Sequence, residues 1–258
     1  MITSFDFEPN AIMALLHHTG SVISGSMALV SLFPGDNLIA FRPQDIDFYV
    51  PLDMKTRAES FFLTSTAYRP IINKKRYYNK YIAEVIFMRH GNKTINIIVS
   101  SGANSLNPIF HFHSTAVMNF ISSTGVFSAY PSLTFVHRNL VNPEYLKNNR
   151  VIQPVEYCMT KYRERGFENG QNLSQWDDIC THKCGEDMFC PRTTRTVSDS
   201  GSFKFKFSSQ PWIQSGQPDS DVYSHWGPTV WRLGGPACSD VKGGNEGFVV
   251  DCKEKDPL

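Results

Sequence analysis

The sequence of 258 residues predicts an α+β protein, because helical and strand-like patterns alternate through residues 1–168 and a hairpin signal joins two of the strands. Residues 169–258 are richer in Gly, Pro, Ser, Cys and Trp, and their patterns are weaker. We therefore expect a first domain over residues 1–168, with a mixed sheet flanked by helices, and a C-terminal extension over residues 169–258 that packs on it. Hydrophobic residues form 41% of the chain, which is enough for a sizeable core.

Each element of the first domain follows from its period and its boundary residues. Pro9 suits a first helical turn and Gly20 ends the same helix, while Asp53 is placed to cap the third helix. The segment His90–Lys93 reads as the turn of a hairpin. The predicted helices cover residues 11–18, 27–33, 54–64, 108–121 and 154–167, and the predicted strands cover residues 21–24, 45–50, 81–89 and 94–100.

The extension carries one clear strand pattern, "GSFKFKFSS". Its period of two puts Phe203, Phe205 and Phe207 on one face, which we expect to meet a core, and Lys204 and Lys206 on the face toward water. The later stretch "YSHWGPTVWRLGGPACSD" is rich in turn residues and aromatic rings, so it predicts short strands and loops.

Charge and segment composition exclude some classes of partner. The chain has 25 basic and 24 acidic residues, so no overall field favours nucleic acid or a membrane surface. The beginning, "MITSFDFEPN", lacks the basic and apolar regions of a secretory signal, and no apolar run approaches the roughly 20 residues that span a bilayer. We expect an intracellular, cytoplasmic protein without a membrane partner, whose six cysteines are reduced or bound to metal.

A pair of aspartates marks the candidate site. Asp45 and Asp47 are two residues apart at the start of a strand, so their side chains share a face and their charges repel. A divalent cation between them resolves the conflict, and Mg²⁺ prefers carboxylate oxygens and the oxygens of substrate phosphates. Upstream, Gly25 permits a close backbone approach and Ser26 opens a helix whose N–H groups can bind phosphate.

This order of motifs resembles the nucleotidyltransferase fold, the polymerase-beta-like superfamily, in the stretches "ISGS" and "DIDF". The resemblance implies a protein that binds a nucleoside triphosphate with Mg²⁺ and moves a nucleotidyl group to a hydroxyl of a protein, an RNA or a small molecule. Asp45 and Asp47 would hold the metal, and Gly25 and Ser26 the phosphates. The stretches "QDIDFYVP", "INIIVS", "PIFHFHSTAVMNFIS" and "YPSLT" also resemble mushroom-type fungal proteins, which implies no activity.

The chain departs from the superfamily pattern in two places. Residues 35–43 lengthen the link between the two motifs, which predicts a loop insertion. The third acid of the fold corresponds to Asn96, which can ligate metal through its carbonyl oxygen but cannot serve as a general base. Glu84, on the neighbouring hairpin strand, is the candidate substitute. Two alternatives stay open: a transferase with Asp45, Asp47 and Asn96 at its centre, or a degenerate relative that binds nucleotide, RNA or protein.

The extension contains a cysteine cluster, "CTHKCGEDMFC". Cys180, Cys184 and Cys190, with His182 between them, can supply zinc ligands. Their spacing matches no standard finger and no second Cys-x-x-Cys supports a site, so ordinary thiols are the favoured alternative to Zn²⁺.

The segment "KYRERGF" carries Lys161, Arg163 and Arg165 near the end of a predicted helix. Charges at this spacing usually form a solvated helix face. Contact with phosphate is the alternative interpretation.

Overall fold

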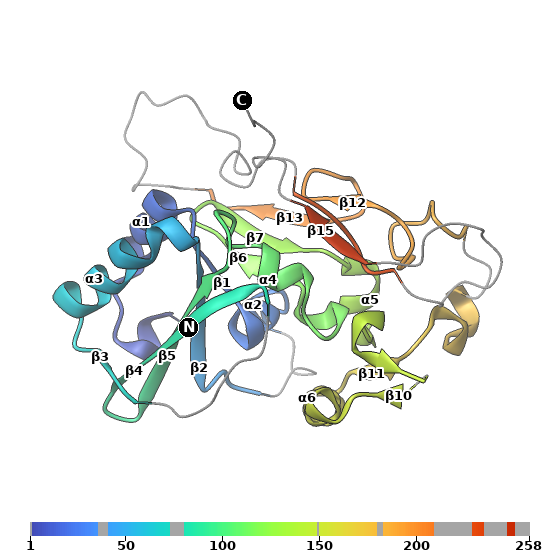
Figure 1. Ribbon diagram of the computed structural model, residues 1–258, viewed down its shortest axis with the longest axis horizontal. Coiled ribbons are helices and arrows are strands. Elements are labelled where there is room, and N and C mark those ends of the chain that lie inside the picture. The colour runs from blue at the N-terminus through green and yellow to red at the C-terminus, as the bar shows by residue number, and fades with distance from the viewer. Residues whose placement is uncertain are drawn as a thin grey trace.

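The computed structural model describes residues 2–35, 41–72, 80–148, 150–179, 183–208, 229–234 and 247–250. Over these residues the chain forms a mixed sheet with helices packed against it, which confirms the predicted α+β class (Figure 1). The element order is helix, strand, helix, strand, helix and hairpin through residue 100, as the sequence patterns predict.

The main sheet joins strands from both halves of the chain. The strand order is β13 (Phe203–Lys206), β7 (Gly125–Ser128), β6 (Asn119–Ile121), β1 (Val22–Ser24), β2 (Asp45–Val50), β5 (Lys93–Ser100), β4 (Ile82–His90) and β3 (Arg69–Pro70). Strands β1 and β2 are antiparallel, whereas β2 and β5 are parallel, and β4 and β5 form the predicted hairpin around Gly91 and Asn92.

The predicted helices begin and end near the residues that the sequence indicates, except for the helix predicted over residues 108–121. Figure 1 shows α1 and α3 beside each other on one side of the sheet, and the two are in contact. The α-helices are α1 (Pro9–Thr19), α2 (Gly25–Ser31), α3 (Lys55–Ser65), α4 (Asn107–Phe110), α5 (Pro131–Thr134) and α6 (Gln153–Glu164), and the 3₁₀ turns are Ile2–Phe5, Leu52–Met54, Thr115–Val117, Pro143–Tyr145, Leu173–Gln175 and Asp177–Ile179.

Alternation along the central strands separates two cores. Ile46, Phe48 and Val50 of β2 point into a core shared with α1, α2 and α3. Tyr49 of β2 and Ile98 of β5 point to the opposite face, into a second core. Asp45 and Asp47 belong to this second face by the same alternation, so the sheet holds them on the side opposite to Phe48.

Residues beyond position 168 contribute to the main sheet and to the second core. Strand β13 pairs with β7 at the edge of the main sheet, and Trp231 is fully buried in the second core. Its indole ring stacks on Phe110 with ring centroids 4.0 Å apart, and its Nε1 donates to the hydroxyl of Tyr130 at 3.0 Å. The smaller sheets are β9 (Leu146–Lys147) with β10 (Arg150–Val151), β8 (Arg138–Leu140) with β11 (Glu168–Gly170), and β12 (Arg195–Thr196), β14 (Val230–Arg232) and β15 (Phe248–Val250).

The predicted helix over residues 108–121 is wrong. The chain leaves α4 after Phe110 and continues through a 3₁₀ turn into β6. Polar side chains satisfy the backbone there: the Asn139 side chain accepts from the Ala116 N–H at 3.0 Å, and Thr115 accepts from the Leu140 N–H at 2.9 Å. An unbroken apolar run does not distinguish a buried helix from a buried strand, because neither leaves a polar stripe.

Two smaller expectations also differ from the structure. Asp53 lies within the 3₁₀ turn Leu52–Met54, and the N-cap position of α3 is Met54, which makes no side-chain cap bond. Phe205 is 56% exposed, although Phe203 and Phe207 pack against the first core as predicted. Among the residues that the structure describes, no helix has the length and apolar character needed to cross a bilayer.

Candidate functional site

Two aspartates and one asparagine converge on the second face of the sheet. Strands β2 and β5 are parallel, and their register puts Asn96 directly beside Asp47. The Asn96 side-chain amide donates to Oδ1 of Asp47 at 2.7 Å and to Oδ2 of Asp45 at 3.3 Å. The prediction that the two acids share a face, with Asn96 next to them, is therefore confirmed. The amide nitrogen faces the carboxylates, so a cation at this point requires the amide to rotate and present its oxygen.

Gly25 lies against the same carboxylate. Ser24 pairs with Asp47 across β1 and β2, and Gly25 follows with a φ of +68°. A Cβ atom at Gly25 would lie only 2.6 Å from Oδ2 of Asp47, so no larger residue fits without displacing the acid. The next residue, Ser26, is 7% exposed on α2. The expected role of Gly25 and Ser26 in phosphate binding stays a prediction.

The electrostatic conflict predicted for the aspartate pair raises the pKa of Asp47. Burial and then the charge of Asp45 raise the pKa of Asp47 to about 7, while the hydrogen bond from Asn96 and the charge of Lys161 lower it. A carboxyl group with this pKa is partly protonated near neutral pH. A cation between the two acids would relieve both unfavourable contributions, so the donor set fits a divalent metal.

The three side chains form one wall of a cavity of about 300 Å³. Aromatic and imidazole rings also line the cavity: Tyr49, which shares the face of β2 with the two acids, and His111, Phe112, His113 and Tyr145. A hollow with a polar end and ring-bearing walls is typical of a small-molecule site.

His111 is a member of this site that the sequence interpretation missed. Its ring is 5% exposed, its Nδ1 lies 3.1 Å from Oε2 of Glu144, and Tyr81 stacks on it with ring centroids 3.4 Å apart. Within the described part of the chain its Nε2 is buried without a hydrogen-bond partner. The hydrogen bond from His111 lowers the pKa of Glu144, which keeps that carboxylate ionised.

His113 also lines the cavity, because the chain is not helical at this point. A helix over residues 108–121 would send His111 and His113 in different directions, so the predicted helix could not bring both rings to one cavity. Burial and then the charge of Lys161 lower the pKa of His113 to about 4, so its imidazole is neutral at physiological pH. The Nδ1 atom of His113 lies 2.8 Å from the Ser114 hydroxyl.

Helix α6 brings positive charge to the two aspartates. Lys161 of α6 lowers the pKa of Asp47 and of His113, and Arg165, which directly follows α6, is close enough for the charge of Asp45 to act on it. The Arg165 guanidinium lies 3.7 Å from the centroid of the Phe41 ring, and burial lowers its pKa. Arg163, between them in sequence, is exposed. The interpretation of all three as a solvated face is therefore wrong for Lys161 and Arg165, which are half-buried.

Glu84 does not replace the missing third acid. It pairs with Val99 of β5 beyond an irregularity in the hairpin, and its carboxylate forms an ion pair with Lys55 at the surface. The residue of β4 that lies beside Asn96 is Phe87. The third position of the site is thus held by an amide and not by a carboxylate.

The predicted zinc site and the predicted loop insertion fall partly outside the described residues. Cys180 and His182 of the zinc site, and residues 36–40 of the insertion 35–43, are not among the residues that the structure describes. Cys184 is half-buried, and Cys190 is buried with its sulfur accepting from the Gly185 N–H at 3.4 Å. Within the described ranges, no group of three or more His, Cys, Asp or Glu side chains is placed to hold a metal ion. The zinc site therefore stays a prediction.

The chain matches no family model, no curated protein and no solved structure.

Proposed function

We propose that the chain binds a nucleoside triphosphate together with Mg²⁺ at Asp45 and Asp47, and transfers a nucleotidyl group to a hydroxyl of an acceptor. The observation that carries this proposal is the convergence of the two carboxylates and Asn96 on the wall of one cavity, with Gly25 in contact with Asp47. Their order along the chain also follows the motifs that resemble the nucleotidyltransferase fold.

The carboxylates and the cations of α6 have complementary roles in this proposal. Asp45 and Asp47 would hold the metal, and the bound metal would supply positive charge to the triphosphate and to the leaving pyrophosphate. Lys161 on α6 and Arg165 directly after it would attract the remaining phosphate oxygens, because each interacts electrostatically with one of the two aspartates. Asn96, once its amide has rotated, would offer the metal a neutral oxygen and add no charge.

A transfer to a hydroxyl also needs a group that accepts its proton. Asn96 has no such capacity, since an amide is not basic. His111 lines the same cavity and has an ionised carboxylate, that of Glu144, on its other ring nitrogen. This arrangement is the usual support for an imidazole that acts as a general base, so we assign the proton to Nε2 of His111.

Transfer of label tests the proposal directly. The full chain is incubated with Mg²⁺ and each nucleoside triphosphate labelled at the α-phosphate, in the presence of a cell lysate. We expect label to pass to an acceptor with wild type and not with Asp47→Asn. His111→Gln should bind nucleotide normally but transfer slowly. His90→Gln, which changes a half-exposed imidazole at the end of β4 and outside the cavity lining, should behave as wild type.

A second candidate is a degenerate relative that binds nucleotide, RNA or a partner protein without catalysis. The observation that favours it is the direction of the Asn96 amide, whose nitrogen donates to both carboxylates and so occupies the position between them. In this alternative the two hydrogen bonds that Asn96 donates stabilise the neighbouring carboxylates, so that the pair needs no metal ion.

Restoring the acid separates the two candidates. Asn96→Asp adds a third carboxylate beside Asp47 and strengthens the metal site. New transfer activity in Asn96→Asp, absent from wild type, would support the degenerate relative. Transfer by wild type that depends on Asp47 would exclude it.

A further inference from the structure

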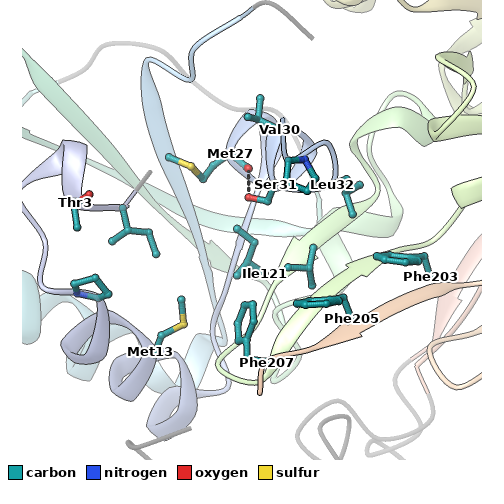
Figure 2. Close-up of a pocket in the computed structure, with 14 residues that line it drawn as sticks. Thr3, Met13, Met27, Val30, Ser31, Leu32, Ile121, Phe203, Phe205 and Phe207 are labelled. Carbon is teal, nitrogen blue, oxygen red and sulfur yellow. Dashed lines mark hydrogen bonds between the residues drawn. The ribbon is translucent and has the colours of Figure 1, made fainter. Parts of the chain in front are cut away.

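A second cavity, of about 620 Å³, lies between the N-terminal segment and the edge of the main sheet (Figure 2). Its walls come from the turn Ile2–Phe5, from α1 and α2, and from β6, β7 and β13. No described residue lines both this cavity and the one that contains Asp45 and Asp47. The proposal below therefore does not rest on the proposed function.

The walls of this cavity are apolar. None of the described residues that line it carries a charged side chain, and its side-chain hydroxyl groups belong to Thr3 and Ser31. The Ser31 hydroxyl donates to the carbonyl oxygen of Met27 at 2.9 Å, so it is already used within α2 (Figure 2). A ligand in this cavity would meet methyl groups, thioethers and aromatic rings.

The cavity reaches from the surface into the core. Thr3 and Phe205 on its walls are exposed, whereas Met13, Met27 and Val126 are at most 8% exposed and belong to the first core. Its volume falls within the range of about 300–1,000 Å³ that is typical of ligand cavities. Water molecules find few hydrogen-bond partners on these walls, so the cavity favours an apolar ligand over water.

The placement of the walls favours an elongated occupant. Figure 2 shows Thr3 and Met13 at one end of the cavity and Phe203 at the other, with Ile121 between them. Phe205, which is 56% exposed, lies on the wall nearer Phe203. Two methionines add adaptable side chains that can follow a flexible ligand.

We propose that this cavity binds a single long hydrocarbon chain, as found in a fatty acid or a fatty alcohol. The walls recognise the chain by contact alone, so the head group lies outside the cavity and contributes little. Affinity should therefore rise with chain length and should be nearly the same for acids and alcohols.

A homologous series tests the proposal on the full chain. Octanoic, decanoic, dodecanoic and tetradecanoic acids, and the corresponding alcohols, compete with the fluorescent fatty acid cis-parinaric acid. We expect one molecule of probe per chain and about fourfold tighter binding for each added methylene until the cavity is full. Binding that does not depend on chain length, or that does not saturate at one equivalent, would overturn the proposal.

Variants locate the binding within the molecule. Ser31→Phe places a ring in the cavity and should weaken binding at least tenfold, whereas Val136→Phe, at a position that is 56% exposed elsewhere, should leave it unchanged. Thr3→Trp narrows the cavity from an exposed rim position and is a second variant in case Ser31→Phe fails to fold. Unchanged affinity in the folded cavity variant would assign the hydrocarbon to another part of the protein.

Discussion

Gly25 and Asp47 lie so close that a single added carbon at Gly25 would stand 2.6 Å from a carboxylate oxygen. The contact joins the end of β1 to the middle of β2, and it puts the beginning of α2 beside the acid pair. The glycine is required for two reasons, its positive φ and the space that Asp47 occupies.

Replacement of Gly25 by alanine should therefore be more costly than replacement of a glycine in open space. Gly91 has a similar φ of +57°, but an added Cβ there meets nothing within 4 Å. We expect Gly91→Ala to lower the free energy of unfolding by about 1 kcal/mol and Gly25→Ala by about 2–4 kcal/mol. Urea denaturation measures both values. Equal losses in the two variants would show that Asp47 does not approach Gly25.

The raised pKa of Asp47 has a defined consequence for stability. The folded state keeps the proton up to about pH 7, whereas the unfolded chain releases it near pH 4. The folded protein therefore binds more protons over this interval, and its stability falls as the pH rises from about 4 to 7. Asp47→Asn removes this loss. Without metal, the free energy of unfolding of the variant should therefore exceed that of wild type by about 2–4 kcal/mol at pH 7, and the two should be similar at pH 4.

Denaturation of both proteins across this pH range checks that expectation. Asp53→Asn is the control, because Asp53 is exposed in the turn before α3 and should not change the pH dependence. If the difference between wild type and Asp47→Asn were constant with pH, Asp47 would titrate normally and the proposed conflict with Asp45 would be absent.

Lys161 should contribute to nucleotide binding while its neighbour on the helix should not. Lys161 is half-buried and acts on Asp47, whereas Arg163 on the same helix is exposed. We expect Lys161→Gln to weaken the binding of a nucleoside triphosphate with Mg²⁺ about tenfold, and Arg163→Gln to change it less than twofold. Calorimetry of both variants gives the comparison. A larger loss in the Arg163 variant would place the phosphates elsewhere.

The buried ring of Trp231 tests whether the extension belongs to the same cooperative unit as the sheet. Trp231→Ala removes its stacking on Phe110 and its hydrogen bond to Tyr130, and should cost about 3–5 kcal/mol. The loss should appear in one unfolding transition detected by both far-UV and near-UV circular dichroism. Val250→Ala, at a position 43% exposed on the adjacent strand, is the control. A separate early transition would instead make the extension an independent domain.

Local patterns predicted most of the first half of the fold. The strand Asp45–Val50 has the predicted bounds, and the hairpin turns at Gly91 and Asn92, because alternation and turn residues are read from neighbouring positions. The region after Phe110 was predicted wrongly, since the Ala116 N–H there donates to the side chain of Asn139, a partner more than twenty residues away. Such a contact leaves no local signal.

The sequence predicted the residues of the candidate site that lie on the two neighbouring strands β2 and β5. Spacing by two put Asp45 and Asp47 on one face, and Asn96 occupied the neighbouring strand at the expected place. The contributions of His111 and Lys161 depend on a loop and on α6, whose approach to the sheet is a tertiary relation. The exclusion of Glu84 depends on the hairpin register, which the sequence left open.

Calorimetric titration with a nucleoside triphosphate and Mg²⁺ tests the central claim, that Asp45 and Asp47 together hold a cation for nucleotide binding. Each of the common nucleoside triphosphates is titrated into wild type, into Asp45→Ala/Asp47→Ala and into the control Asp53→Ala, with and without Mg²⁺. We predict Mg²⁺-dependent binding to wild type and to the control, and none to the double variant, which should remain folded. Binding of the same affinity by the double variant would contradict the account.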